Sequence, residues 1–186
     1  DQGNSSWGDP LNGQNVVQYD GVSRPYSPTN ETINDFYRTG STWTNTLALS
    51  GGNEVGNFRF SASNLDNQDI MPNSGFDRTT FNGNMNGTFW KLVLQVSGQY
   101  TLEEAKNRPR LSDSPGNANY TILTKAPNIS FSDLRGDPDK LGADPANGFE
   151  FRHQANRYSQ NPFWAAHQFL RLDEKNRFFG NASLQY

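Results

Sequence analysis

The chain has 186 residues, a formal net charge of −3 and a hydrophobic share of only 33%. Charged residues make up 19% and aromatic residues 13%, so the polarity comes from Asn, Ser, Thr, Gln and Gly, a mixture that favours ordered β-structure over disorder. The sequence has no basic patch for phosphates, which argues against nucleic acid as a partner. It has no apolar run long enough for a membrane-spanning helix, and it has no cysteine for thiol chemistry.

The first segment, 1–41, is rich in Gly, Asn, Ser, Asp and Pro and has no sustained periodicity, so we expect a loop. Two runs of alternating polar and apolar residues follow at about 42–50 and 57–65, separated by a Gly-rich turn. Alternation with a period of two is typical of half-buried strands, and two such runs around a short turn predict a β-hairpin. A polar connection, 66–77, leads to the next strand.

The clearest alternation lies at about 78–89, and another strand of similar length is expected at about 91–103. The stretch 104–176 contains many Pro, Gly, Asn and Asp residues and is too long for a plain connection inside a compact domain. We interpret it as an elaborate functional loop with a brief helix between Asn161 and Leu170. A last alternating strand occupies 177–186.

Each predicted strand carries an apolar and a polar set of side chains, which point to opposite faces of a sheet. The repeated amides of the third strand are costly to bury in a dry interior, at about 1–3 kcal/mol for each amide without a partner. We therefore expect the polar set to face a water-filled lumen: Arg78, Thr80, Asn82, Asn84 and Asn86. We expect the apolar set to face lipid: Phe58, Phe60, Phe81, Met85, Leu92, Leu94 and Val96.

Long and short connections alternate strictly along the chain. In an up-and-down barrel of the bacterial outer membrane, extracellular loops are long and periplasmic turns are short, so this order places every long segment on one side. Some aromatic residues suit the two membrane boundaries: Trp43, Phe89, Trp90, Tyr100 and Tyr186. One turn does not fit, because neither Trp90 nor Lys91 readily takes the positive φ of a tight hairpin turn. Either a strand ends earlier there or residues are missing.

Several short motifs occur in order along the chain: Ser6-Trp7-Gly8 with Leu11-Asn12-Gly13; Asp35-Phe36-Tyr37-Arg38-Thr39-Gly40; Ser50-Gly51-Gly52-Asn53-Glu54; Asn64-Leu65-Asp66-Asn67 with Ile70-Met71-Pro72-Asn73; and Asn161-Pro162-Phe163-Trp164 with Arg177-Phe178-Phe179-Gly180-Asn181. Together they resemble SusC/RagA-type TonB-dependent transporters of Bacteroidota. Their order and spacing cover nearly the whole chain, which makes the joint match fairly specific. The chain departs from the family at Asp9, where Pro is frequent, and at Asp69, where Gly is frequent.

The resemblance implies an all-β fold, a segment of a large antiparallel transmembrane β-barrel with long extracellular loops. A complete transporter of this type is similar to a barrel of roughly 22 strands around a plug domain. We therefore expect further polypeptide that supplies the plug domain and the remaining barrel strands. The implied function is TonB-dependent import of an oligosaccharide or peptide nutrient across the outer membrane, without catalysis or a cofactor.

The resemblance also implies the partners. They are a SusD-like surface lipoprotein, TonB through parts outside this chain, the glycan or peptide substrate and outer-membrane lipid, and the transporter–lipoprotein pairs are expected to form a dimer. Aromatic residues of the long loop are candidates for contact with substrate or partner, although packing within the loop is the favoured interpretation: Tyr158, Phe163 and Trp164.

No residue pattern indicates an enzyme or a metal site. His153 and His167 are the only histidines, and no Ser/His/Asp or metal-ligand spacing surrounds them, so we expect both on a loop surface. Asp137, Asp139 and Asp144 do not match the spacing of a calcium loop, and a solvated acidic turn is favoured.

A secreted β-sandwich that binds carbohydrate is the alternative, because the strands of a soluble sandwich also alternate. In a sandwich the same apolar residues would converge in a dry interior between two layers. Solubility without detergent separates the two hypotheses.

Overall fold

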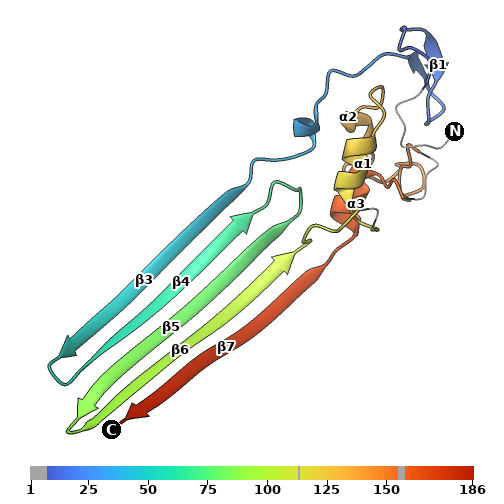
Figure 1. Ribbon diagram of the computed structural model, residues 1–186. Helices are drawn as coiled ribbons and strands as arrows, with labels where there is room; N and C mark the ends of the chain where they lie inside the picture. The colour runs from blue at the N-terminus through green and yellow to red at the C-terminus, as the bar shows by residue number, and fades with distance from the viewer. Residues whose placement is uncertain (1–7, 113, 155–157) are drawn as a thin grey trace. The chain divides into compact units, whose positions relative to one another are not determined.

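The computed structural model describes residues 8–112, 114–154 and 158–186. The chain folds into two compact units, each built from discontinuous segments (Figure 1). The sheet unit consists of Gly40–Asp69, Ser74–Lys106 and Leu172–Tyr186. The loop unit takes its described residues from Asp1–Thr39, Ile70–Asn73 and Asn107–Arg171. Ser6 and Trp7, which contribute to the family resemblance, lie outside the described residues.

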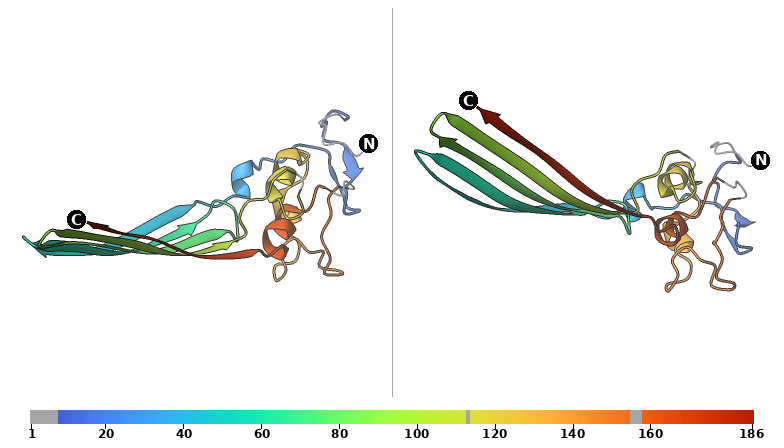
Figure 2. Two further views of the ribbon diagram at one scale, coloured as in Figure 1. Left: turned by 60° about the horizontal axis from the view of Figure 1, so that its bottom comes forward. Right: turned by 90° about the horizontal axis from the view of Figure 1, so that it is seen from below.

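The sheet unit is one sheet of five strands in the order β3-β4-β5-β6-β7, each antiparallel to its neighbours. Figure 2 shows these strands as a single twisted layer. The strands are β3 (Ser41–Asn53), β4 (Gly56–Gln68), β5 (Gly75–Phe89), β6 (Leu92–Lys106) and β7 (Leu172–Gln185). The predicted antiparallel, β-rich structure is thereby confirmed.

The strands are longer than the alternation predicted. The connection expected at 66–77 shrinks to 69–74, because Asp66 and Asp77 pair opposite each other in the ladder between β4 and β5. Likewise, β7 begins at Leu172 and not at 177. Polar side chains hide these strand ends in the sequence, whereas backbone hydrogen bonds continue through them.

Turns of two residues join β3 to β4 and β5 to β6. In the first turn, Asn53 Oδ1 accepts hydrogen bonds from the backbone N–H groups of Val55 at 2.9 Å and Gly56 at 3.1 Å. In the second turn, Trp90 adopts a φ of 58°, which costs a residue with a side chain about 1–2 kcal/mol. This corrects the expectation at Trp90: β5 does not end early, and Trp90 and Lys91 suffice to close the turn.

Aromatic rings lie over glycines in this sheet. A Cβ atom on Gly83 would approach Cε1 of Phe60 to 3.0 Å, so the Phe60 ring fills the space that a side chain would take. The Phe178 ring covers Gly180 in the same way, with Cζ at 3.0 Å from the Cβ position. Gly83 allows the Phe60 ring to lie across the neighbouring strand, where it contributes to cross-strand packing, whereas Phe178 lies over a glycine of its own strand.

The loop unit contains more regular structure than the sequence predicted. It contains a two-stranded sheet, a short 3-10 helix and three short α-helices: β1 (Asn15–Val17), β2 (Ser23–Pro25), η1 (Ile33–Asp35), α1 (Ala118–Thr124), α2 (Phe131–Leu134) and α3 (Pro162–Gln168). The predicted helix between Asn161 and Leu170 is confirmed by α3.

A hydrophobic core holds the loop unit together. The centroid of the Phe36 ring lies 5.0 Å from that of Phe163 and 5.9 Å from that of Phe131. The buried cluster comprises Phe36, Ala118, Ile122, Ile129, Phe131, Leu134, Phe163, Ala165 and Ala166. No strand of the sheet unit contributes a residue to this described cluster, so the apolar residues of the sheet lie elsewhere.

Candidate functional site

One face of the sheet unit is polar along its length. The register places the five residues expected to line a lumen on this face of β5: Arg78, Thr80, Asn82, Asn84 and Asn86. Directly opposite them on β6 stand Glu103, Thr101, Gln99, Ser97 and Gln95. Hydroxyl groups continue the pattern onto the other strands, where Thr46 Oγ1 donates to Ser63 Oγ at 3.0 Å. The face is therefore a surface of hydroxyl, amide and charged groups.

A concavity of about 400 Å³ lies on this polar face. Its charged residues are Arg78 on β5, Glu103 on β6 and Arg177 on β7. The rest of its lining is Thr44, Ser63, Leu65, Thr80, Asn82, Gln99 and Thr101. Apart from Leu65, these residues offer hydrogen-bond donors and acceptors of the kind that bind polar ligands.

Both arginines of the concavity lie beside an aromatic ring of their own strand. Cζ of Arg78 is 6.0 Å from the centroid of Phe76, and Cζ of Arg177 is 5.5 Å from that of Phe179. Residues two apart on a strand share a face, so each ring supports its guanidinium while N–H groups stay available. Within the described part of the chain, neither arginine forms an ion pair with a carboxylate.

The opposite face of the sheet unit is apolar and exposed. The seven residues expected to face lipid share it, each with 36–51% of its surface exposed: Phe58, Phe60, Phe81, Met85, Leu92, Leu94 and Val96. Leu47, Leu49, Phe178 and Leu184 extend the face onto β3 and β7, with 65–78% exposed. Soluble monomers rarely expose contiguous apolar patches larger than a few hundred Å².

An acidic row ends the apolar face on the side where the long connections attach. Asp66, Asp77, Glu104 and Glu174 stand side by side on four adjacent strands. Like charges directly opposite one another repel, and the repulsion grows as the dielectric constant falls, so this row requires water. From Leu92 to Tyr100 along β6, the apolar band below the row extends roughly 27 Å at roughly 3.4 Å per residue.

Aromatic residues end the band on the opposite side. Nζ of Lys91 lies 4.9 Å from the ring centroid of Trp90 and 5.9 Å from that of Tyr186. Trp90 and Tyr186 are 83% and 82% exposed, and Phe89 is 66% exposed. Of the other two aromatic residues singled out from the sequence, Trp43 stands opposite Asp66 in the acidic row, whereas Tyr100 lies within the band.

The three loop aromatics singled out from the sequence have different environments. Phe163 is only 4% exposed and belongs to the core of the loop unit, so it is not a contact for substrate or partner, and packing within the loop, the favoured interpretation, holds for it. Trp164 is half-buried, with Nζ of Lys140 at 5.0 Å from its ring centroid. Tyr158 is 49% exposed.

Asn161 organises this region, and sequence reasoning missed its role. Its side chain is fully buried and caps α3: Oδ1 accepts from the N–H groups of Phe163 at 2.9 Å and Trp164 at 3.3 Å. Its Nδ2 donates to the carbonyl oxygens of Leu134 at 2.8 Å and Phe151 at 3.0 Å. Asn followed by Pro is a typical helix start, so the signal was present in the sequence.

His153 is buried in the loop unit, with 4% of its surface exposed, which contradicts the expected surface position. Burial, together with the positive charges of Lys125 and Arg152, lowers the pKa of its imidazole to about 4. Its ring packs edge-on against Tyr19 at 6.4 Å between centroids, and burial raises the pKa of the Tyr19 hydroxyl to about 12. His153 is therefore a neutral packing residue. His167 is half-buried on α3.

The acidic turn at 137–144 uses its carboxylates locally. Asp137 Oδ1 accepts from the N–H group of Asp139, and Asp144 Oδ1 accepts from that of Ala146, both at 2.8 Å. Such bonds are typical of Asx turns. Across the described residues, no group of three or more His, Asp or Glu side chains is placed to hold a metal ion.

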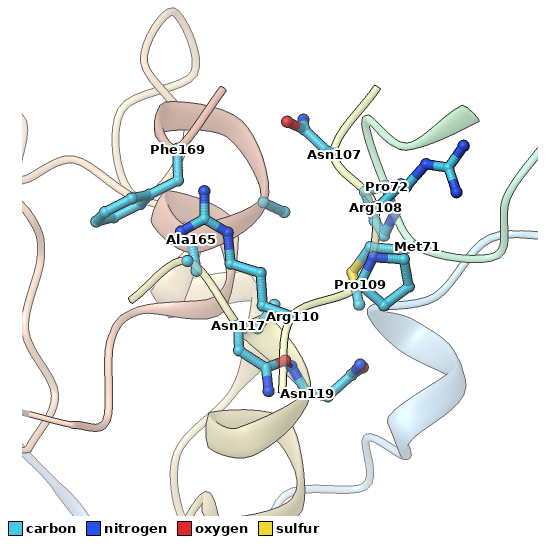
Figure 3. Close-up of a pocket in the computed structure, with 13 residues that line it drawn as sticks. Met71, Pro72, Asn107, Arg108, Pro109, Arg110, Asn117, Asn119, Ala165 and Phe169 are labelled. Atoms are coloured by element: carbon cyan, nitrogen blue, oxygen red, sulfur yellow. Dashed lines mark hydrogen bonds between the residues drawn. The ribbon is translucent and has the colours of Figure 1, made fainter. Parts of the chain in front are cut away.

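A small hollow lies between α1 and α3 of the loop unit (Figure 3). Arg110 lines it: Nη1 donates to the carbonyl oxygen of Pro115 at 2.6 Å, and Cζ lies 5.9 Å from the ring centroid of Phe169. Arg108 turns away from Phe169 in the same view. The hollow has about 20 Å³ of space, which is room for a single water molecule and too little for a sugar or a peptide.

The comparisons with known proteins found no relative of this chain. A scan against protein-family models and a search of the curated proteins both found no match for this chain. None of the described helices is both long enough and apolar enough to cross a bilayer. A function for this chain is therefore inferred from the polar face and the apolar face of the sheet unit.

Proposed function

We propose that the chain is part of a transmembrane β-barrel in the bacterial outer membrane that imports an oligosaccharide or peptide nutrient. The apolar face contacts lipid, and the polar face lines the water-filled interior. TonB supplies the driving force through parts outside this chain, and a SusD-like lipoprotein captures substrate at the cell surface. The observation that carries the proposal is the exposed apolar face opposite a predominantly polar one.

The apolar face is too large to remain in water. Five strands at roughly 4.8 Å spacing and a band of roughly 27 Å give an area of roughly 650 Å². At about 25 cal/mol per Å², covering this area is worth about 16 kcal/mol, which is comparable to the entire stability of a typical domain. Lipid or a second protein layer must therefore cover it.

The dimensions of the sheet favour lipid over a second layer. Its strands run for 13–15 residues, whereas strands of globular proteins have a mode of about 5–6 and membrane-spanning strands need about 9–11. At a tilt of about 40°, the apolar band is about 20 Å tall, close to the belt of about 25 Å in outer-membrane barrels. The acidic row and the aromatic cluster at Trp90 fit the two edges of such a belt.

Import, as distinct from a passive structural role, rests on two features. The polar face and its concavity form a wall suited to a hydrated solute, and the long connections fold into a unit with its own core, as expected of a surface that receives a substrate. The resemblance to SusC/RagA-type transporters supplies the transport class and the partners.

The absence of cysteine from these 186 residues allows a direct test. Single cysteines at Phe81 and Met85 on the apolar face, and at Asn82 and Asn84 on the polar face, would carry a nitroxide spin label. The complete protein would be studied in membranes. Collisions of the label with oxygen, which partitions into lipid, would be compared with those of a water-soluble nickel chelate.

We expect labels at Phe81 and Met85 to favour oxygen, and labels at Asn82 and Asn84 to favour the nickel chelate. Because the four positions alternate on one strand, each label controls for its neighbour. A secreted β-sandwich gives a different result: the protein stays soluble without detergent, and the two apolar positions are shielded from both reagents. That outcome would refute the transport proposal and support the carbohydrate-binding alternative.

A further inference from the structure

The sheet unit sorts its charged side chains by face. The polar face carries Arg59, Arg78, Lys175 and Arg177 against Glu103 and Asp173. The apolar face carries Asp66, Asp77, Glu104 and Glu174 against Lys106. The polar face thus has an excess of positive charge, although the whole chain has a net charge of −3.

The positive charge is concentrated at the concavity. Arg78 and Arg177 line it from β5 and β7, two strand spacings apart and two residues out of step, which separates their backbones by roughly 12 Å. Glu103 lies on the strand between them, directly opposite both Arg78 and Lys175. Three cationic groups therefore surround a single carboxylate.

The two guanidinium groups are ready to bind an anion. Each lies beside an aromatic ring at 5.5–6.0 Å, and neither forms an ion pair within the part of the chain that the structure describes. A guanidinium binds a carboxylate through two parallel hydrogen bonds, and its planar fork loses little freedom on binding. The hydroxyl and amide groups between them, such as Thr80, Thr101 and Gln99, suit the hydroxyl groups of a sugar.

We infer that the concavity between β5 and β7 binds an oligosaccharide that carries carboxylate groups. Arg78 and Arg177 hold the carboxylates, and the neighbouring hydroxyl and amide groups hold the sugar hydroxyls. An acidic peptide fits less well, because Leu65 is the only apolar residue in the lining and offers no pocket for peptide side chains. The inference rests on the proposed function, since it requires water and substrate to reach the polar face.

The test uses the complete protein in detergent and isothermal titration calorimetry. The probe is oligogalacturonate, and the matched neutral probe is its methyl ester of the same length. We expect the acid form to bind at least tenfold more tightly than the ester in low salt. The preference should shrink in 0.5 M salt, because salt screens charge–charge attraction.

Variants that are expected to change the affinity in opposite directions separate a binding role from a folding defect. The change R78Q together with R177Q should weaken binding of the acid form at least tenfold and leave the ester unaffected. The change E103Q should strengthen binding of the acid form, because it removes the only carboxylate of the lining. R59Q, on the same face but outside the concavity, is the matched control and should change the affinity less than threefold.

The outcomes also separate this inference from the proposed function. Equal affinity for acid and ester, no binding of the acid form, or tighter binding of oligoglutamate than of oligogalacturonate overturns the inference. If the spin labels at Asn82 and Asn84 still contact the aqueous reagent, the transport proposal survives such a result. If those labels are shielded from water, the transport proposal fails first, and the inference fails with it.

Discussion

Replacing Asn161 by alanine tests whether one buried amide holds the loop unit together. The side chain makes four hydrogen bonds, two as acceptor at the start of α3 and two as donor to carbonyl oxygens, and none of its surface is exposed. Water cannot replace these bonds unless the core opens. Each buried group left without a partner costs about 1–3 kcal/mol.

We expect N161A to lower the free energy of opening α3 by about 3–5 kcal/mol, since several orphaned groups will relax in part. The matched control is N117A, which removes the N-cap of α1. Asn117 is only half-buried, and its Oδ1 makes a single capping bond, to the N–H group of Asn119 at 3.1 Å. The loss of such a cap costs about 1 kcal/mol.

The assay is amide hydrogen exchange of the complete protein, followed by mass spectrometry of peptides that cover α1 and α3. Exchange in α3 should accelerate on the order of a hundredfold or more in N161A, because about 1.4 kcal/mol corresponds to a factor of ten. Exchange in α1 should accelerate only about fivefold in N117A. If α3 exchanges at nearly the wild-type rate in N161A, the buried amide is not what stabilises this unit.

Three further changes test other parts of the structure. G142A should open the loop unit more than G21A does. Both glycines have a φ near +80°, but only at Gly142 would a Cβ lie 2.1 Å from a backbone nitrogen of α3. Equal rates of proteolysis in the two variants would contradict this prediction. The imidazole of His153 has a pKa of about 4 when folded and about 6.5 when unfolded, so the free energy of unfolding is up to about 3 kcal/mol higher above pH 6.5 than below pH 4. This difference is lost as the pH falls from 6.5 towards 4. H153F should therefore flatten the dependence of α3 exchange on pH. G83V should displace the Phe60 ring and lower the stability of the sheet by about 1–3 kcal/mol, whereas an unchanged denaturation midpoint would argue against the ring-over-glycine packing.

The faces of the sheet could be predicted from the sequence because they depend only on the period of two. Phe81 and Asn82 occupy opposite faces whatever the exact ends of β5 are. The strand ends could not be predicted, because a ladder continues wherever backbone groups pair, and residues such as Asp66 and Asp77 look like a turn while they do so. The acidic row was hidden for the same reason.

The core of the loop unit could not be predicted, because it has no periodicity. Phe36, Ile129 and Phe163 come from distant parts of the chain, each next to Pro, Asn, Asp or Ser. The sequence left Phe163 among the candidates for contact with substrate or partner because exposed and buried aromatics look alike in a loop. The charge of the concavity was also missed, because Lys175 lies in a stretch expected to be loop and β7 was expected to begin only at Arg177.

The turns of two residues at Glu54-Val55 and Trp90-Lys91 fix the register of both hairpins, and this limits how the sheet can change in size. One residue added to each strand would move every side chain beyond the insertion to the opposite face of the sheet, so that the apolar and polar faces would be exchanged. Viable changes must therefore add residues in pairs, about 7 Å of strand at a time. Homologues with longer or shorter strands should therefore differ from this chain by even numbers of residues in each strand.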